Sequence, residues 1–411
     1  MEWKAGSEHD LQESLDELRE LVTTAGGAVI GHGIQRLESP IAATYIGTGK
    51  AAEFAAECRE LEIDTVIFDD ELSPAQSRNL EEVFGCKVLD RTSLILDIFA
   101  QRARTREGKL QIELAQLEHL LPRLTRFWGH LSRQKGGIGM RGDGETQLET
   151  DRRRVQDRIA RISRELDEVR QHRSTQREGR QRRLWPLASI VGYTNAGKST
   201  LLNQLTGAST LAEDKLFATL DPTTRRLRLP SNQNVLLTDT VGFIRKLPHG
   251  LVEAFKATLE EVVVADLLLH VVDASHPNAE EQIDAVNLVL NEIGAAERPT
   301  LMVFNKIDRF QTQDRAQQFL DRYPKSVAVS ARSGEGIPQL LGELGAALRP
   351  IRQFVELRLP HEASAIIAKL HQVGEVVECD YSGAEVSMKA RIQPHHRAEF
   401  ARFVVQDLTV S

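Results

Sequence analysis

The sequence predicts an α/β protein. A doubly wound, mostly parallel sheet with a phosphate-binding loop is preceded by a small α/β domain and a long helical hairpin, and followed by a small α+β domain. Three observations predict this. The 411 residues, 41% of them hydrophobic, suffice for about two to four cores. Apolar strand-like runs alternate with helical runs, and a leucine pattern of helical period lies between two such regions. The expected domains are 1–104, 105–180, 185–350 and 351–411.

The first domain shows short apolar runs between helical patterns. Strands are expected at Ala28–Ile30, Thr65–Phe68 and Lys87–Leu89, with helices at Lys50–Glu60, Ser73–Phe84 and Thr92–Gln101. The stretch GTGKAA at 47–52 imitates a phosphate loop, but Ala51 stands where a magnesium-binding hydroxyl is required. It therefore predicts a turn that opens a helix.

From residue 109 leucines recur every three or four positions, and a second apolar seam follows between 148 and 169. This pattern predicts an antiparallel coiled-coil hairpin. The stretch KGGIGMRGDGETQLE, 135–149, joins the two helices and contains GxGxxG. A dinucleotide-binding loop must follow a buried strand, and here a helix precedes it. The glycines instead predict a flexible basic tip that ends at Thr146, a candidate helix cap.

Charge is distributed unevenly along the chain. Residues 101–184 carry 21 Lys and Arg against 12 Asp and Glu, a net +9; because the whole chain carries −7, the rest carries −16. An anionic partner for the basic segment and a merely solvated helix surface both explain this asymmetry. The sequence has three cysteines without CxxC spacing, no signal peptide and no long apolar run, which favours a cytoplasmic protein without a membrane partner. We also expect a monomer.

A nucleotide site is predicted in the third domain. Strand-like runs alternate there with helical segments, at 189–191, 235–237, 267–272, 299–304 and 326–329. GYTNAGKS at 192–199 is GxxxxGKS directly after the first of these strands and before a helix. Its backbone N–H groups suit phosphate oxygens, Lys198 suits the β- and γ-phosphates, and the Ser199 hydroxyl suits Mg²⁺. The tail beyond residue 352 predicts strand–helix–strand–strand–helix, with a hairpin around Ser382–Gly383.

Further motifs follow in order and identify the base as guanine. FATLDPTTR offers Thr219 as a second hydroxyl ligand of Mg²⁺. DTVG offers two groups: the Asp239 carboxylate, which suits a water bound to Mg²⁺, and the Gly242 N–H, which suits the γ-phosphate. In NKID the Asp308 carboxylate suits two N–H groups of guanine, which adenine lacks. The predicted GTP and GDP contacts are Gly192, Tyr193, Thr194, Asn195, Ala196, Gly197, Lys198, Ser199, Phe217, Ala218, Thr219, Leu220, Asp221, Asp239, Thr240, Val241, Gly242, Asn305, Lys306, Ile307, Asp308, Ser330, Ala331 and Arg332.

The predicted catalytic groups are Lys198, Thr219, Gly242 and Asn195. Phe243 follows Gly242, where many GTPases place a glutamine that orients the attacking water, so hydrolysis by the isolated domain should be slow. The Asn195 carbonyl could help to hold K⁺ beside the phosphates, which would offset developing charge. Alternatively, Asn195 hydrogen-bonds its own loop.

The sequence resembles the HflX family of ribosome-associated GTPases. The resemblance rests on NAGKS, FATLDPTTR, DTVGFIRKLPHGLVEAFKATLEEV and NKID, and upstream on DRTSLILDIFAQRARTREGKLQIELAQL, LPRL and GGIGMRGDGETQLETDRRR. It spans about residues 45–331. The resemblance implies a Mg²⁺-dependent GTPase that binds the large (50S) ribosomal subunit and splits stalled or idle 70S ribosomes, notably under stress.

The resemblance also implies that the hairpin meets 23S rRNA near the peptidyl-transferase region. The candidate rRNA contacts are Arg133, Lys135, Arg141, Arg152, Arg153 and Arg154. For the last three, a solvated first turn of a helix is an equally good interpretation. Two alternatives to ribosome splitting stay open. One is a hibernation or assembly factor whose nucleotide only sets RNA affinity; the other is ATP-driven RNA remodelling from residues 1–135, which lack a phosphate loop.

Overall fold

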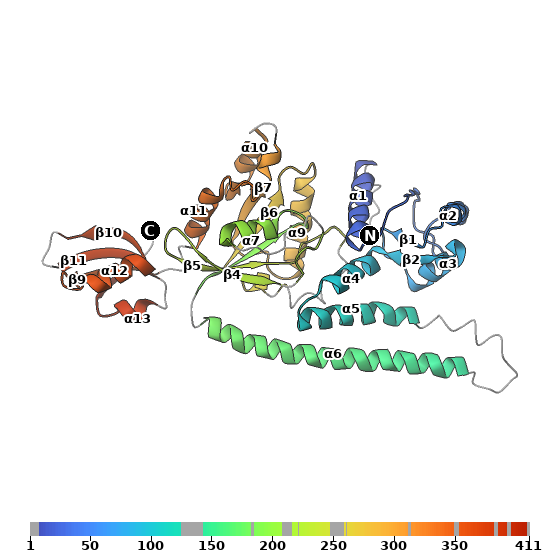
Figure 1. Ribbon diagram of the computed structural model, residues 1–411, viewed down its shortest axis with the longest axis horizontal. Helices are drawn as coiled ribbons and strands as arrows, with labels where there is room; N and C mark the ends of the chain where they lie inside the picture. The colour runs from blue at the N-terminus through green and yellow to red at the C-terminus, as the bar shows by residue number, and fades with distance from the viewer. Residues whose placement is uncertain are drawn as a thin grey trace. The chain divides into compact units, whose positions relative to one another are not determined.

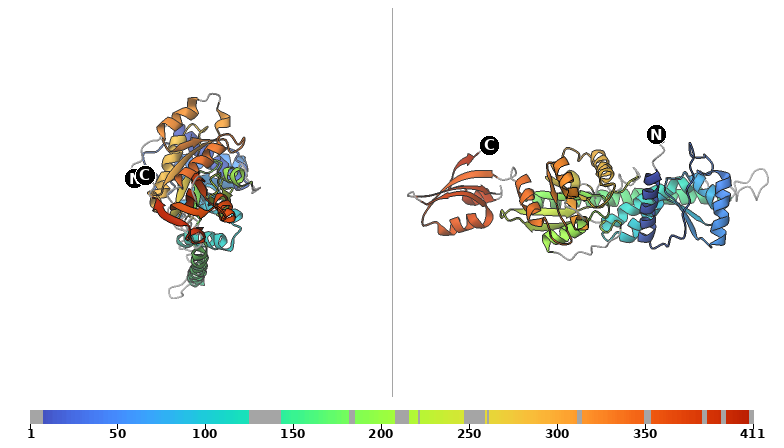
Figure 2. Two further views of the ribbon diagram at one scale, coloured as in Figure 1. Left: turned by 90° about the vertical axis from the view of Figure 1, so that its left-hand side faces the viewer. Right: turned by 90° about the horizontal axis from the view of Figure 1, so that it is seen from above.

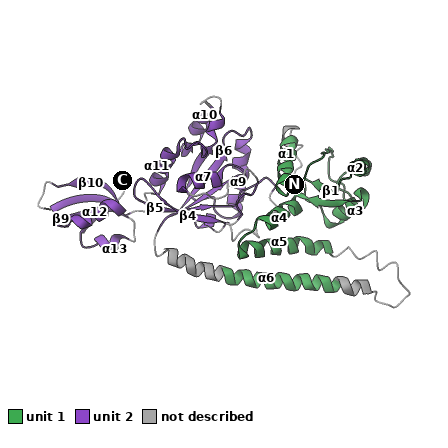
Figure 3. Cartoon of the chain, in the orientation of Figure 1, with its two compact units in different colours: residues 1–169, 247–254 green, residues 170–246, 255–411 purple. Residues whose placement is uncertain are grey.

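Figure 1 shows the computed structural model of the chain. The structure describes residues 8–124, 143–181, 185–207, 216–220, 222–246, 259, 261–310, 314–348, 353–381, 385–392 and 396–408. The chain divides into two compact units, coloured separately in Figure 3: residues 1–169 with 247–254, and residues 170–246 with 255–411.

The N-terminal part of the first unit is a small α/β domain. Strands β1 and β2 pair in parallel, with Thr65 opposite Lys87, and helices surround them. The predicted helix opening at GTGKAA is confirmed, because Gly47 caps α2. The predicted strand at Ala28–Ile30 is wrong: this stretch is irregular, flanked by glycines, and Ile30 is 63% exposed. The elements are α1 Glu8–Thr24, α2 Thr48–Glu60, β1 Thr65–Phe68, α3 Pro74–Phe84, β2 Lys87–Asp90 and α4 Arg91–Arg102.

A buried ionic network joins the elements of this domain. Arg91, only 2% exposed, donates to Asp69 at 2.7 Å and also to Glu17. These carboxylates raise the pKa of Arg91, although burial opposes them. Asp90 is also buried and accepts from Arg123 at 2.8 Å. Buried charges of this kind persist only when they are paired, so the network fixes how α1, β1, α4 and the following helix α5, Arg106–Leu124, pack.

Two antiparallel helices follow, α5 Arg106–Leu124 and α6 Asp143–Gln181, as the leucine pattern predicted. A cluster of Leu110, Ile162 and Leu166 forms their shared core. Arg158 makes two hydrogen bonds to the Glu113 carboxylate at 2.7 and 2.9 Å. Arg106 reaches Glu165 at 3.3 Å. The earlier residue on α5, Arg106, pairs with the later residue on α6, Glu165, so the two helices run antiparallel.

The second unit contains a six-stranded sheet in the order β4-β5-β3-β6-β7-β8, parallel except for β4. Helices α7 and α11 pack in one apolar cluster and α9 and α10 in another, so the sheet is doubly wound as predicted (Figure 2). The bounds are β3 Leu187–Gly192, α7 Lys198–Thr206, β4 Thr223–Arg228, β5 Asn234–Asp239, β6 Leu267–Asp273, α9 Ala279–Glu292, β7 Thr300–Asn305, η1 Ile307–Arg309, α10 Asp314–Arg322, β8 Ser326–Ala328 and α11 Ile337–Ala347.

The same unit ends in a four-stranded antiparallel sheet of order β10-β11-β9-β12. The predicted strand–helix–strand–strand–helix order and the β10–β11 pairing are confirmed; the loop 382–384 lies outside the described residues. A final strand, β12, was not predicted. The elements are β9 Gln353–Pro360, α12 Ser364–Val373, β10 Glu375–Asp380, β11 Glu385–Ile392, α13 Arg397–Phe400 and β12 Val404–Leu408. Across the parts of the chain that the structure describes, no helix combines the length and apolar character needed to span a bilayer.

Candidate functional site

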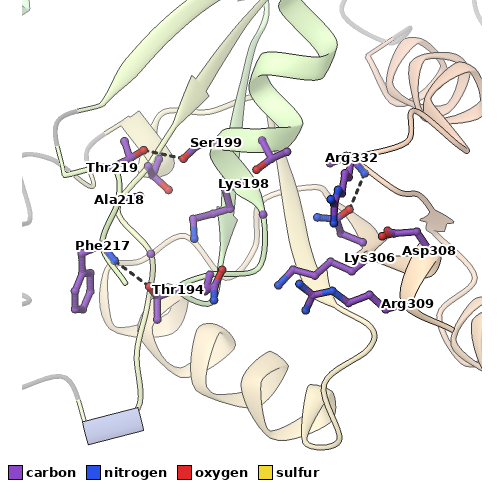
Figure 4. Close-up of a pocket in the computed structure, with 17 residues that line it drawn as sticks. Thr194, Lys198, Ser199, Phe217, Ala218, Thr219, Lys306, Asp308, Arg309 and Arg332 are labelled. Carbon is purple, nitrogen blue, oxygen red and sulfur yellow. Dashed lines mark hydrogen bonds between the residues drawn. The ribbon is translucent and has the colours of Figure 1, made fainter. Parts of the chain in front are cut away.

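A cavity of about 350 Å³ opens at the carboxyl ends of the parallel strands (Figure 4). Strands β3, β5 and β7 end there at Gly192, Asp239 and Asn305. Ligands of doubly wound sheets bind at this edge because loops diverge there. The lining residues are Thr194, Asn195, Gly197, Lys198, Ser199, Thr200, Phe217, Ala218, Thr219, Thr240, Gly242, Asn305, Lys306, Asp308, Arg309, Ala331 and Arg332.

The loop after β3 needs glycine at both of its ends. Gly192 has φ +148°, and a Cβ there would lie 2.2 Å from the Val271 carbonyl oxygen on β6. Gly197 has φ +93° where α7 begins. Asn195 also takes a left-handed conformation, φ +59°, which Asn tolerates better than most residues. Its side chain is exposed and makes no hydrogen bond within the described part of the chain.

Lys198 occupies the centre of the cavity wall. Its Nζ donates to the carbonyl oxygens of Tyr193 at 2.7 Å and of Gly192 at 3.2 Å. Burial lowers the pKa of Lys198 to about 8, and the Asp239 carboxylate only partly opposes this. Two neutral carbonyls leave most of the ammonium charge uncompensated. The site therefore favours an anionic ligand beside Nζ.

Three oxygen side chains meet next to this lysine. The Ser199 hydroxyl lies 2.7 Å from the Thr219 hydroxyl and donates to Asp239 at 2.6 Å. Burial raises the pKa of Asp239, and its other carboxylate oxygen has no hydrogen-bond partner among the described residues. Hydroxyl and carboxylate oxygens are the donors that Mg²⁺ prefers. The donor set and the orphaned oxygen fit a hydrated Mg²⁺ ion.

The chain after β5 is tied to the phosphate loop through its backbone. Phe243 donates its N–H to the Gly192 oxygen at 3.1 Å and accepts from the Thr194 N–H at 2.7 Å. A Cβ on Gly242 would lie 2.8 Å from the Thr194 Cα and 2.9 Å from the Lys198 Nζ. The Phe243 side chain is 2% exposed and has no polar atom. It cannot orient an attacking water, as the sequence predicted.

Asn305 braces the opposite end of the cavity. Its amide donates to the Ala196 oxygen of the phosphate loop at 2.9 Å and accepts from the Ala331 N–H at 2.9 Å. Asn305 is 2% exposed. One buried side chain thus satisfies two backbone groups from separate loops and holds them at a fixed spacing.

Polar side chains beside Asn305 face the open end. The Asp308 carboxylate accepts from the Ser330 hydroxyl at 2.6 Å, which orients it. Lys306 forms an ion pair with Asp273 at 2.7 Å. In Figure 4 the side chains of Lys306 and Arg309 lie alongside each other on this side of the cavity. The Asp308 carboxylate suits the two adjacent N–H donors of guanine, and Lys306 lies on the same side of the cavity.

Most of the predicted nucleotide contacts line this one cavity. Thr200, Arg309 and the ion-pair partner Asp273 were missed; Thr200 and Arg309 directly follow predicted motif residues, whereas no local pattern marked Asp273. Asp221 lies outside the described residues. The predicted residues that do not line the cavity are Gly192, Tyr193, Ala196, Leu220, Asp239, Val241, Ile307 and Ser330.

The predicted rRNA contacts fall into two sets. Arg152, Arg153 and Arg154 are exposed on α6, and Arg154 reaches Asp151 at 3.3 Å. Because the Arg154 side chain is 76% exposed, this ion pair contributes little to the stability of the fold. The other candidates, Arg133, Lys135 and Arg141, lie outside the described residues.

The chain is similar to known proteins over most of its length. Three family models match the chain: GTP-binding GTPase N-terminal over residues 12–100, GTP-binding GTPase Middle Region over 102–180, and 50S ribosome-binding GTPase over 188–306. The chain is 48% identical to GTPase HflX of Caldanaerobacter subterraneus over 96% of this chain and 91% of that protein. It is 48% identical to GTPase HflX of Escherichia coli K12 over 93% and 89%. Among solved structures, the SsGBP and GDP complex is 28% identical, covers 82% of this chain and 95% of that one, and superposes with a TM-score of 0.48.

Proposed function

The chain belongs to the HflX family of GTPases, and from this premise we propose that it binds the large ribosomal subunit and uses GTP to split stalled or idle 70S ribosomes into subunits. The observation that carries the proposal is the convergence of four guanine-nucleotide motifs, GYTNAGKS, FATLDPTTR, DTVG and NKID, on one cavity, in a chain whose middle region is a long basic helical hairpin.

The cavity binds GTP in one orientation. Lys198 contacts the β- and γ-phosphates, and the Gly242 N–H contacts the γ-phosphate. The Asp308 carboxylate accepts from the guanine edge. The oxygens of Ser199, Thr219 and Asp239 would hold Mg²⁺, which would supply charge neutralisation for the phosphates.

Loss of the γ-phosphate releases two segments. Thr219 contacts the Ser199 hydroxyl at 2.7 Å and the Asp239 carboxylate, both of which belong to the Mg²⁺ donor set, and Gly242 lies against the phosphate loop. Both segments therefore respond to whether GTP or GDP is bound. Because Phe243 carries no polar group, hydrolysis in the isolated protein is slow. Asn195 stands exposed at the loop, where its carbonyl is available to a K⁺ ion beside the phosphates.

The hairpin contacts 23S rRNA. The exposed Arg152, Arg153 and Arg154 bind phosphates independently of sequence, together with Arg133, Lys135 and Arg141. Such contacts are strongly weakened by salt. GTP loading sets the affinity of the whole chain for the ribosome, and the inserted hairpin separates the subunits.

The proposal is tested by sedimentation of 70S ribosomes incubated with the full chain and a non-hydrolysable GTP analogue. We expect free subunits with the wild-type protein and intact 70S ribosomes with Lys198→Ala, which cannot hold the phosphates. Tight ribosome binding without free subunits in any nucleotide state would support the alternative, an RNA-binding hibernation or assembly factor. Turnover of GTP in K⁺ and in Na⁺ tests the role of Asn195, and equal rates would remove it.

A further inference from the structure

A second cavity lies in the unit that carries the GTPase sheet, away from the nucleotide site. It has a volume of about 340 Å³. Its lining residues come from the segment before β3, from β4 and β5, and from positions on or near α12 and α13. Trp185, Arg226 and Arg228 are among these residues, and none of the lining residues that the structure describes is acidic. The cavity is therefore a concentration of positive charge in a chain whose net charge is −7.

Both arginines have only neutral partners. Arg226 donates from Nε and Nη2 to the Asn234 amide oxygen at 3.1 and 2.9 Å. Arg228 donates from Nη2 to the Asn232 amide oxygen at 3.1 Å and to the Gln372 carbonyl at 2.9 Å. Within the described residues, no carboxylate pairs with either guanidinium. Their charges are oriented by amides and stay uncompensated.

The tryptophan contributes a plane and an unused donor. The Arg226 guanidinium lies 4.6 Å from the centroid of the Trp185 ring, which is cation–π geometry. The indole N–H is buried and has no acceptor among the residues that the structure describes. An oxygen-rich ligand that enters here finds donors and an aromatic surface together.

The placement on β4 presents the two arginines as a pair. Side chains two residues apart on a strand share a face, and the intervening Leu227 is 7% exposed and belongs to the core. β4 is also the edge strand of the sheet. Elsewhere in this unit, Arg322 is neutralised by Glu280 at 2.9 Å. The pair on β4 lacks such a partner and is aimed at the cavity.

We infer that this cavity binds a phosphodiester of a single-stranded RNA segment, with Arg226 and Arg228 on the phosphate oxygens and the amides of Asn232 and Asn234 beside the sugar or base. An acidic peptide matches the charge, but amides that both donate and accept, next to an aromatic ring, suit a nucleotide better. The site lies on the GTPase unit rather than on the hairpin. It therefore adds an RNA contact that the proposed function does not contain.

The test uses Trp185 as a local reporter. The chain has three tryptophans, and Trp3→Phe with Trp128→Phe leaves Trp185 alone. Titration of the full chain in its GDP-bound form with a short oligouridylate is expected to quench this fluorescence. Arg226→Gln with Arg228→Gln should raise the half-quenching concentration about tenfold. It should also reduce the slope of log affinity against log salt by about 0.7, because both arginines contact one phosphate and each single-strand phosphate contact contributes about 0.7.

Arg298→Gln with Arg402→Gln is the matched control, since both arginines are exposed and this variant loses the same two charges outside the cavity. It should leave the titration unchanged, and all variants should bind fluorescent GDP equally. An unaltered Trp185 signal, or equal quenching in the double variant, would overturn the inference. So would an equal response to inorganic phosphate, which assigns a free anion, or to polyglutamate, which assigns an acidic protein. None of these outcomes bears on subunit separation, which is measured with ribosomes and Lys198→Ala.

Discussion

Replacing Asp308 by asparagine tests the assignment of the base most sharply. The carboxylate accepts from Ser330 at 2.6 Å and stands exposed at the rim of the cavity, so it is oriented yet hydrated. Hydrogen bonds to charged groups contribute about 1.5–3 kcal/mol each, and exposure argues for the lower value. Two lost guanine N–H contacts then cost about 3 kcal/mol. This corresponds to about a 100-fold weaker affinity for GTP.

The assay is displacement of a fluorescent GDP analogue by GTP or by XTP. Xanthine carries a carbonyl where guanine carries the exocyclic amine, so the side-chain amide of the Asp308→Asn variant can donate to it, and XTP affinity should rise. Ser330→Ala is the control: it keeps the charge, removes the hydrogen bond that orients it, and should weaken GTP about threefold to tenfold. Wild-type GTP affinity in the Asp308→Asn protein would refute the assignment.

Three further predictions concern buried polar groups. Asn305→Ala leaves two buried backbone groups unpaired and should lower the free energy of unfolding by about 2–4 kcal/mol in urea titrations; an unchanged midpoint contradicts the bracing role. The pKa of Lys198 is about 8 without nucleotide and rises when a phosphate binds, so GTP affinity should hold below pH 8 and fall up to tenfold per unit above it, as calorimetry between about pH 7 and 9 can measure. Arg91→Met removes the cation that pairs with the carboxylates of Glu17 and Asp69, and it should lower the free energy of unfolding by about 3–5 kcal/mol, measured by thermal unfolding. A loss under about 1 kcal/mol would show that the network is dispensable.

The nucleotide site was predictable because its motifs are local and their order is informative. GYTNAGKS, DTVG and NKID each begin at the last residue of a strand, whereas FATLDPTTR leads into β4. Parallel strands bring their carboxyl ends to one edge, so Lys198, Asp239 and Asn305 had to converge. The helical hairpin was predictable for a similar reason: leucines at helical spacing define a face, and the Arg158–Glu113 and Arg106–Glu165 pairs together confirm the antiparallel direction.

The remaining features depend on contacts between distant residues. β4 contains a single core residue, Leu227, and owes its conformation to pairing with β5. Residues 28–30 have strand propensity but pair with no strand among the described residues. Propensity alone does not keep three residues in a β-strand. The ion pair of Lys306 with Asp273 joins the ends of β7 and β6, and neither local sequence predicts it.

In the proposed function, the basic hairpin couples GTP binding to subunit separation. Light scattering of 70S ribosomes mixed with the full chain and a non-hydrolysable GTP analogue measures that separation directly, for the wild-type chain and for one lacking residues 130–150. We expect scattering to fall with the wild type and to stay constant with the deletion, while both proteins bind fluorescent GDP equally. An equal fall with the deleted chain would show that the hairpin does not separate the subunits.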